Sequence, residues 1–470
     1  MKKVFIFLLL MILILSGFSY AEMIFNDVSR LNPIHVRQII QPTTIEEIRS
    51  KILEAQRLNL RISIAGKRHS QGGQQSCEDC IVLDMLSFNK ILLLDVKNLI
   101  IRVQSGATWD QIQRYINPFN LSLEVMQTSN IFTVGGSLSA NVHGRDVRYG
   151  DIRNAVKSFR LILADGNIVN VSREENLELF RLVIGGLGLF GVILDVDITL
   201  TDNDVYEEHD KIMNYKEYSQ YFKRNIKDNP NTWLHFASLS ISPDDNFLKE
   251  MIVTSYQKSD RKLKNQNLSE EMDVARNKFF FGLSRKYSWG KQLRWYLQKV
   301  LGEESKGGQL ISRNNAMRNP VKFLDYYSSK DTDILQEYFI PVDRFAEFVD
   351  GLRGIVKNDK VNLMNVGVRH VPADNTGYIS YAPQDSIAVV LYINQKISDK
   401  GKKDAKAWTR RIVDLVLKCE GTYYLVYQLY PTREQLKRAY PKIDEFFSKK
   451  RFYDPQEIFM NKFYETYSQN

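Results

Sequence analysis

The chain has 470 residues, of which 44% are hydrophobic, and its formal net charge is +9. This length allows a large buried core and predicts two lobes. The charged residues are spread along the sequence without a block of like charges, which argues against a nucleic-acid-binding tail and favours a lysine-rich solvated surface. A basic funnel for anionic ligands is the alternative interpretation of this charge.

The N-terminus predicts a signal for export. Lys2 and Lys3 precede an apolar run over residues 4–15, and small and polar residues follow as far as Ala21. This order is typical of a secretory signal peptide over residues 1–21, and the apolar run is short for a transmembrane helix. We therefore expect a periplasmic or secreted protein, attached to a membrane only if the leader stays uncleaved.

The next part of the chain predicts short strands and helices in irregular order. Residues 42–58 combine threonines, two early acids and an apolar period, which indicates a capped amphipathic helix. Residues 61–65 alternate like a strand and run into a glycine-containing loop at 66–70, of sequence GKRHS. Such a mixture favours an α+β fold. Further strands are predicted at 81–85, 91–95 and 99–104, and a further helix at 109–115.

Cys77 and Cys80 have C-x-x-C spacing, which is found in redox and zinc sites. No second C-x-x-C or nearby histidine pair completes a zinc site, so we predict no bound metal. In an oxidising compartment the two cysteines form either a local disulfide or two free thiols.

Two glycine-containing turns follow in the region 161–200. Asp165-Gly166 separates two apolar runs and predicts a β-hairpin. Residues 186–191 match G-x-G-x-x-G, but a helical segment precedes them and an alternating strand follows. A dinucleotide-binding turn needs the opposite order, so we do not expect a Rossmann-type site here.

The sequence becomes rich in lysine, asparagine and aromatic residues after about Asp202. We therefore predict a first domain at 22–204, a second domain at 205–430 and a C-terminal segment at 431–470 that packs back on the first. Residues 258–320 show little periodicity and are the hardest to interpret, and we expect a mobile loop or lid within them. The last clear elements are strands at 362–371, 386–393 and 423–427 and a helix at 433–450.

The glycine-rich turns, read in order, resemble the FAD-binding domain of the vanillyl-alcohol-oxidase (PCMH-type) superfamily, over residues 36–200. The match rests on the GKRHS loop, Thr133-Val134-Gly135-Gly136-Ser137, His143-Gly144, Asp165-Gly166 and the 185–194 region. The resemblance implies a two-lobed α+β fold, in which a PCMH-type domain is followed by a substrate-binding cap with an antiparallel sheet and flanking helices.

The resemblance also implies FAD as the cofactor, attached covalently through His69. The alternative is a loop histidine beside a non-covalent FAD, and a second covalent link is not expected because no cysteine occurs near Asn141. Turns of consecutive backbone N–H groups would bind the diphosphate. His143 is either close to the flavin ring or a structural contact. Arg145 and Arg148 are expected at the surface, and the alternative is that they help to hold phosphate or substrate. The implied cofactor residues are Ala65, Gly66, Lys67, Arg68, His69, Ser70, Thr133, Gly135, Gly136, Ser137, Asn141, His143, Gly144, Gly191 and Ile193.

The cap must supply a cation or N–H dipole for the flavin and a base for the substrate hydroxyl. The candidates are Arg369 and His370 on one predicted strand, Tyr392 and Asn394 on the next, and Tyr427 or Gln428 on the third. Of these, Arg369, Tyr392 and Gln428 are selected as the catalytic candidates. Strand alternation places Arg369 and His370 on opposite faces, and we prefer Arg369. A His-Trp-Gly-Lys segment that lactone-oxidising relatives carry is missing.

These observations predict an FAD-dependent oxidoreductase that oxidises a hydroxyl-bearing carbon of a polyol, sugar or lactone, with a small-molecule alcohol as substrate and O2 as the expected acceptor. The alternatives are an FAD-dependent dehydrogenase or epimerase-type enzyme on a lipid-linked or sterol alcohol, and a catalytically inactive flavin-binding protein. No nucleic-acid partner is expected.

Overall fold

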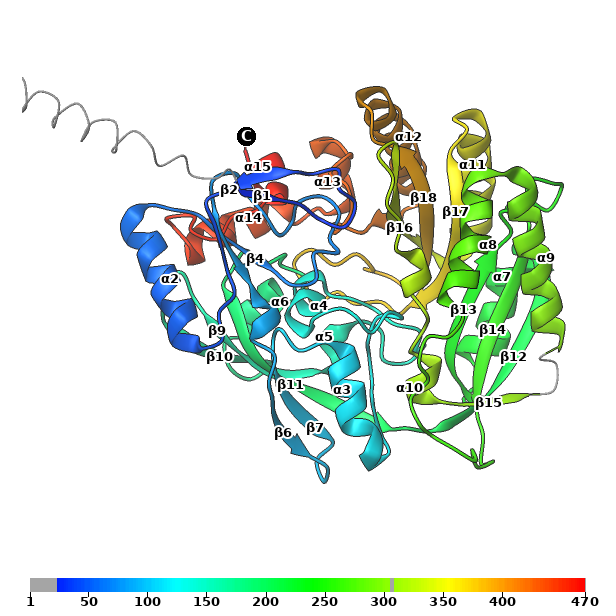
Figure 1. Ribbon diagram of the computed structural model, residues 1–470, viewed down its shortest axis with the longest axis horizontal. Coiled ribbons are helices and arrows are strands. Elements are labelled where there is room, and N and C mark those ends of the chain that lie inside the picture. The colour runs from blue at the N-terminus through cyan, green and yellow to red at the C-terminus, as the bar shows by residue number, and fades with distance from the viewer. Residues whose placement is uncertain (1–22, 305–307, 470) are drawn as a thin grey trace, which may run out of the picture.

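Two large sheets divide the chain into two lobes, which lie on the left and right of Figure 1. The computed structural model describes residues 23–304 and 308–469, so the predicted signal peptide at 1–21 lies outside the described residues. Within the described part of the chain, no helix is long and apolar enough to cross a membrane.

The first lobe contains a parallel three-stranded sheet in the order β3-β5-β4 and a six-stranded sheet in the order β10-β9-β11-β7-β6, with β8 paired to β11. A short hairpin, β1 (Met23–Phe25) with β2 (Ile34–Val36), precedes them. The strands are β3 (Gln38–Ile40), β4 (Ile62–Ala65), β5 (Ile81–Asp84), β6 (Ile91–Asp95), β7 (Ile100–Gln104), β8 (Leu121–Leu123), β9 (Val156–Ile162), β10 (Ile168–Ser172) and β11 (Val192–Asp202). The helices are α2 (Ile45–Leu58), α3 (Trp109–Ile116), α4 (Val134–Ala140), α5 (Ile152–Ala155) and α6 (Leu177–Val183).

Local sequence signals set several of these elements. Thr44 caps α2, and its hydroxyl and the Glu47 side chain form the reciprocal bonds of a capping box. The β9–β10 hairpin turns at Gly166, whose φ of +80° suits glycine. Both predictions are confirmed. The order around residues 186–191 is also as predicted, because α6 precedes this glycine-rich segment and β11 follows it.

The second lobe is built on one antiparallel eight-stranded sheet, in the order β15-β12-β14-β13-β17-β18-β16-β19. β11 of the first lobe ends at Asp202, and β12 begins at Val205. The strands are β12 (Val205–Asn214), β13 (Thr232–Leu239), β14 (Glu250–Lys258), β15 (Gln309–Ser312), β16 (Asp331–Pro341), β17 (Asn362–Val371), β18 (Ser386–Lys396) and β19 (Thr422–Tyr423). The helices are α7 (Tyr215–Tyr221), α8 (Val274–Lys286), α9 (Ser288–Glu304), α10 (Arg313–Ala316), α11 (Phe345–Asn358) and α12 (Asp399–Lys418).

The structure corrects three sequence interpretations in this half. The segment 258–320 is not one long loop, because it contains α8, α9, β15 and α10. The helix predicted at 433–450 is two helices, α13 (Arg433–Ala439) and α14 (Ile443–Tyr453), since Pro441 cannot continue a helix. The strand predicted at 423–427 is only β19, and the chain beyond it leaves the sheet and runs along the cavity described below.

The C-terminal segment returns to the first lobe, where its red helices lie beside the blue N-terminal strands in Figure 1. Phe459 pairs with Ile62 of β4, and the Met460 N–H donates to the Ile62 carbonyl at 2.8 Å. The last helix, α15 (Lys462–Tyr467), follows this contact. Residues from both ends of the chain therefore support the strand that leads into the GKRHS loop.

Candidate functional site between the two lobes

A cavity of about 800 Å³ lies between the two lobes. On the first lobe it is lined by the loop after β4, by residues 127–143 and by the segment that leads into β11. On the second lobe it is lined by one face of the central strands and by residues 424–427. Chain segments that are distant in sequence thus line one shared site.

In the first-lobe wall, the backbone of two glycines lies in very close contact with neighbouring residues. A Cβ on Gly66 would lie 2.3 Å from Thr133 Oγ1, and a Cβ on Gly135 would lie 2.8 Å from Ser105 Cβ. Thr133 caps α4 by accepting a hydrogen bond from the Gly136 N–H. Only glycine therefore lets the 66–70 loop and the start of α4 approach each other, which exposes backbone to the cavity.

His69 lies in this wall with its ring edge against Phe132, at 4.8 Å between ring centroids. Burial, together with the charge of Lys67, lowers the pKa of His69 to about 4. The imidazole is therefore neutral at pH 7, as nucleophilic attack by a ring nitrogen requires.

All but two of the predicted cofactor residues line the cavity; the exceptions are Asn141 and Gly144. Asn141 ends α4 in a left-handed conformation and donates to Asp151 Oδ2 at 2.7 Å. Gly144 packs on the carbonyl of Met126, which a Cβ would approach to 2.6 Å. Both residues therefore shape the wall from behind and do not face the cavity.

The second-lobe wall is a row of side chains across four strands. Across the sheet, Ser238 of β13 lies opposite Gly367 of β17. Val390 of β18 lies between Gly367 and Glu337 of β16 and is opposite both. Opposed residues of antiparallel strands point to the same face, and all four line the cavity. A Cβ on Gly367 would meet only Val390, at 3.8 Å, so this glycine leaves the middle of the row open.

Glu337 and His143 form a buried pair across the two lobes. The His143 Nε2–Glu337 Oε1 distance is 2.7 Å, and both side chains are at most 5% exposed. Burial raises the pKa of Glu337, but the charges of His143 and Arg369 and the hydrogen bond from His143 outweigh it, so its pKa is lowered overall. Glu337 is therefore an ionised carboxylate in the cavity wall, and Tyr427 Oη lies 3.4 Å from its other oxygen.

The structure places the three predicted catalytic residues differently. Arg369 lines the cavity and donates to Thr128 Oγ1 at 2.8 Å, whereas His370 points to the opposite face, beside Phe222. Tyr392 also lines the cavity, and its hydroxyl donates to Asp333 at 3.2 Å. Gln428 does not line the cavity, because its amide donates to Ser29 Oγ at 3.1 Å. The geometry therefore does not support a catalytic role for Gln428, and its neighbour Tyr427 takes its place in the wall.

Sequence reasoning missed Glu337 and misplaced Arg145. Glu337 is the one charged residue in the segment 334–341. A single carboxylate in this otherwise uncharged segment could have identified it as a candidate site residue. Arg145 was expected at the surface, and this prediction is wrong, because the residue is only 6% exposed and lines the cavity. Arg148, by contrast, is partly exposed and pairs with Asp146.

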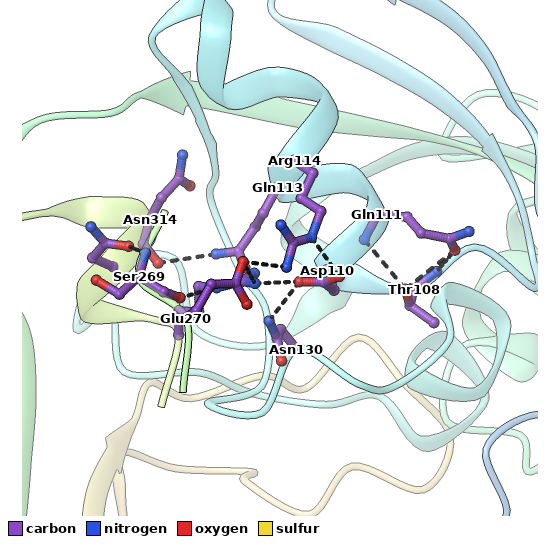
Figure 2. A network of polar contacts seen from close by, with 11 residues as sticks. Thr108, Asp110, Gln111, Gln113, Arg114, Asn130, Ser269, Glu270 and Asn314 are labelled. Atoms are coloured by element: carbon purple, nitrogen blue, oxygen red, sulfur yellow. Dashed lines mark hydrogen bonds and ion pairs between the residues drawn. The ribbon is translucent and has the colours of Figure 1, made fainter. Parts of the chain in front are cut away.

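A polar network joins the two lobes at the rim of the cavity. Figure 2 shows Asp110 and Arg114 of α3 facing Glu270 of the second lobe. Arg318 of the second lobe pairs with Asp110 at 2.5 Å and is itself only 7% exposed. Asn130 donates to the same carboxylate at 3.1 Å. Asp110 is therefore the shared acceptor of this contact.

The predicted C-x-x-C pair lies away from the cavity. Cys77 and Cys80 are both buried and free, and the Cys80 thiol lies 2.8 Å from the Cys77 carbonyl. Within the described residues, no group of three or more histidine, cysteine or acidic side chains could hold a metal ion.

Comparisons with known proteins match both lobes. Residues 36–172 match the family described as FAD binding domain, and residues 249–467 match the D-arabinono-1,4-lactone oxidase family. The chain is 25% identical over 193 residues to L-gulonolactone oxidase of Bos taurus, which covers 39% of this chain and 44% of that protein. It is 26% identical over 157 residues to a putative D-arabinono-1,4-lactone oxidase of Neurospora crassa, covering 33% of this chain and 28% of that protein.

A third relative matches over a longer region. Decaprenylphosphoryl-beta-D-ribose oxidase of Mycolicibacterium smegmatis is 22% identical over 408 residues, which cover 81% of this chain and 83% of that protein. The matches to the two lactone oxidases, in contrast, span less than half of those proteins.

The first-lobe wall fits FAD. Besides the exposed backbone at Gly66 and Gly135, it presents the hydroxyls of Ser105 and Ser129, which are buried and have no hydrogen-bond partner among the described residues. Buried polar atoms are rarely left unpaired, and a flavin dinucleotide offers both phosphate oxygens and ring heteroatoms to them.

Proposed function

We propose that this chain, which belongs to the PCMH-type FAD-binding superfamily and resembles its aldonolactone oxidases, oxidises a hydroxyl-bearing carbon of a sugar, polyol or lactone-type substrate. The observation that carries the proposal is the ionised Glu337 that faces the cavity from the second lobe while His143 of the first lobe holds one of its oxygens. Glu337 faces the cavity, and its second oxygen lies near Tyr427, where a substrate hydroxyl can reach it; this position favours a base over a purely structural ion pair.

Bound FAD would supply the hydride acceptor for this reaction. The chain's own residues do the remaining work. Glu337, through its oxygen near Tyr427, accepts the proton of the substrate hydroxyl, and the His143–Glu337 pair retains that proton as a unit. Arg369 lies on the same wall and stabilises negative charge that develops in the cavity.

We propose that FAD is joined covalently to His69. The neutral, buried imidazole beside Phe132 supports this proposal. Denaturing purified protein with acid would leave the yellow colour in the pellet, and His69→Ala would release it into the supernatant. Colour that stays soluble in the parent protein would exclude the covalent link while leaving FAD binding intact.

A second candidate is a dehydrogenase acting on a lipid-linked sugar. The match to decaprenylphosphoryl-beta-D-ribose oxidase over 81% of this chain favours the lipid-linked sugar as substrate. Flavin bleaching under anaerobic conditions with a panel of polyols, lactones and lipid-linked sugars would identify the substrate class. Peroxide release in air would indicate an oxidase that uses O2, and bleaching without peroxide a dehydrogenase. Failure of every compound to bleach a flavin-loaded protein would reject an oxidoreductase of alcohols.

We further propose that the chain is exported through its N-terminal leader, 1–21. Fractionation of cells that express the full chain would test this proposal, with the N-terminal sequence of the recovered protein as the measurement. A product in the cytosol that begins at Met1 would contradict it.

A further inference from the structure

Arg145 is a buried cation without a matching acid. Its side chain lines the cavity, and the residue is 6% exposed. One guanidinium nitrogen donates to the Ala316 carbonyl at 3.1 Å, while Nε has no hydrogen-bond partner in the described part of the chain. The guanidinium also lies over the ring of Phe236, at 3.9 Å from its centroid. A stacked guanidinium with a free N–H is held in place yet only partly satisfied.

Two other buried arginines have acids beside them: Arg313 is 2.8 Å from Asp146, and Arg285 pairs with Asp333. Arg294, which also lines the cavity, has no acid beside it, but it donates to the Met364 carbonyl and to Asn365 Oδ1. Arg145 forms no ion pair with any described carboxylate. Burial lowers its pKa to about 10, Arg369 acts in the same direction, and Tyr256 and Glu208 oppose the shift without overcoming it. An arginine in this setting is energetically costly unless an anion joins it.

Arg145 and Arg369 act on the same part of the cavity. Ala237 of β13 lies opposite Val368 of β17, so their neighbours Phe236 and Arg369 are opposite each other by the same register and share the cavity face. Arg145 stacks on that Phe236. The nearby carboxylate, Glu337, already holds His143 at 2.7 Å. The guanidinium groups of Arg145 and Arg369 therefore face a part of the cavity whose nearby carboxylate, Glu337, is already bonded to His143.

We propose that the substrate carries a carboxylate or a phosphate in addition to its oxidisable hydroxyl, and that Arg145, with Arg369, binds this anionic group. This inference rests on the function proposed above. It predicts a hydroxylated acid or a phosphorylated sugar or polyol as substrate, and not a neutral lactone. The planar guanidinium suits both anions, since it can donate two parallel hydrogen bonds to either one. A neutral substrate would leave the Arg145 guanidinium in the cavity wall without a counter-ion.

The test uses matched pairs of probes on the full-length, flavin-containing protein. Gluconate is compared with glucitol for the carboxylate, and glucitol 6-phosphate with glucitol for the phosphate. Binding is followed by the change in flavin absorbance, and turnover by anaerobic bleaching. We expect at least one anionic probe to bind about ten- to a hundredfold more tightly than glucitol, which corresponds to a charge-assisted hydrogen bond.

Three variants locate the effect. Arg145→Gln should remove the preference, so that the anionic probes bind no more tightly than glucitol, and Arg145→Lys should keep part of it. Arg148→Gln is the matched control, because Arg148 lies three positions away, pairs with Asp146 and does not line the cavity. This control should keep the full preference.

Several results would overturn the inference. One is equal binding of glucitol and both anions by the parent protein; another is an anion preference that survives Arg145→Gln. A loss of glucitol binding equal to the loss of anion binding would also overturn it, since Arg145 would then serve the flavin or the fold. Bleaching by glucitol alone would reject the anionic substrate while supporting the proposed oxidation, so the two proposals can fail separately.

Discussion

The two walls of the cavity are built from different chemistry. The first-lobe wall consists of glycines, small hydroxyl residues and backbone, as at Gly66, Gly135 and Ser105. The second-lobe wall consists of charged and aromatic side chains that stand on a rigid sheet, as at Glu337 and Arg369. A large cofactor with phosphates suits exposed backbone N–H groups, whereas a small substrate is selected by a few precisely placed side chains.

This difference separates cofactor binding from chemistry. A change in the first wall should alter how much FAD the protein holds, and a change in the second should alter what the bound FAD can do. His143 and Arg145 are the exceptions, because both belong to the first lobe, yet His143 pairs with Glu337 and Arg145 stacks on Phe236 of the second. The experiments below test this separation, in order of decreasing expected effect.

Glu337→Gln tests the second wall and should have the largest effect. The amide cannot take up the substrate proton, so we expect flavin reduction to slow by about 10²- to 10⁴-fold. The FAD content should stay as in the parent protein. Stopped-flow bleaching with the substrate from the panel measures the rate. Glu124→Gln is the control, because Glu124 accepts from Thr199 outside the cavity. An unchanged rate in Glu337→Gln would remove the carboxylate from the mechanism.

Asp151→Asn tests the contact between the two lobes. The quantity measured is the pH dependence of the free energy of unfolding. Burial raises the pKa of Asp151 from 3.8 to about 7, helped by the charge of Asp374 of the second lobe and opposed by Arg153. The folded state then binds more protons than the unfolded state between pH 4 and pH 7, so stability falls as the pH rises through this range. The total loss is roughly 4 kcal/mol at most.

The asparagine variant should lose this pH-dependent decrease. Urea midpoints at pH 5 and pH 8 measure the difference, and Asp343→Asn, at an exposed site, serves as the control. Parallel pH profiles for the parent protein and Asp151→Asn would contradict the assignment.

Gly135→Ala tests the first wall. The new Cβ would meet Ser105 Cβ at 2.8 Å and push the start of α4 away from its neighbour, at a cost of about 1–3 kcal/mol. We expect less flavin per chain, while the chains that retain flavin reduce it at the parent rate. The ratio of flavin to protein absorbance measures the first effect. Gly354→Ala, where a Cβ meets nothing within 4 Å, should change neither quantity.

Asp110→Asn tests the rim network of Figure 2 and should have the smallest effect. Asp110 is about a third exposed, so its ion pairs with Arg114 and Arg318 contribute about 1 kcal/mol or less. We expect a small fall in melting temperature at low salt that disappears in concentrated salt, because salt screens exposed charges. A fall of equal size at both salt concentrations would point to packing as the cause.

The first lobe could be predicted well from the sequence because its signals are local. Thr44 and Glu47 lie within one helical turn, and the Asp165-Gly166 turn encodes its own hairpin. In the GKRHS loop and in the Thr133 region, the glycines likewise stand next to the site residues whose close packing they permit. The break between the two helices at Pro441 could also have been predicted from the local sequence, because proline cannot continue a helix.

The second lobe could be predicted less well because its signals are distant. Gln428 was chosen from a strand that ends at Tyr423, so the expected alternation did not apply to it. Arg145 of the first lobe was misplaced for the same reason, because nothing in the segment around the His143-Gly144 turn indicates that Phe236 of a second-lobe strand covers its guanidinium.

The sequence by itself determined the cofactor lobe: its turns, its α+β class and the position of His69 beside the cavity. Only the tertiary structure decided which charges meet there. Glu337 and His143 are 194 residues apart, and they touch because the register of the eight-stranded sheet and the closure of the two lobes bring them within 2.7 Å. A backbone turn depends on the conformations of adjacent residues, whereas a buried charge depends on what the rest of the fold places next to it.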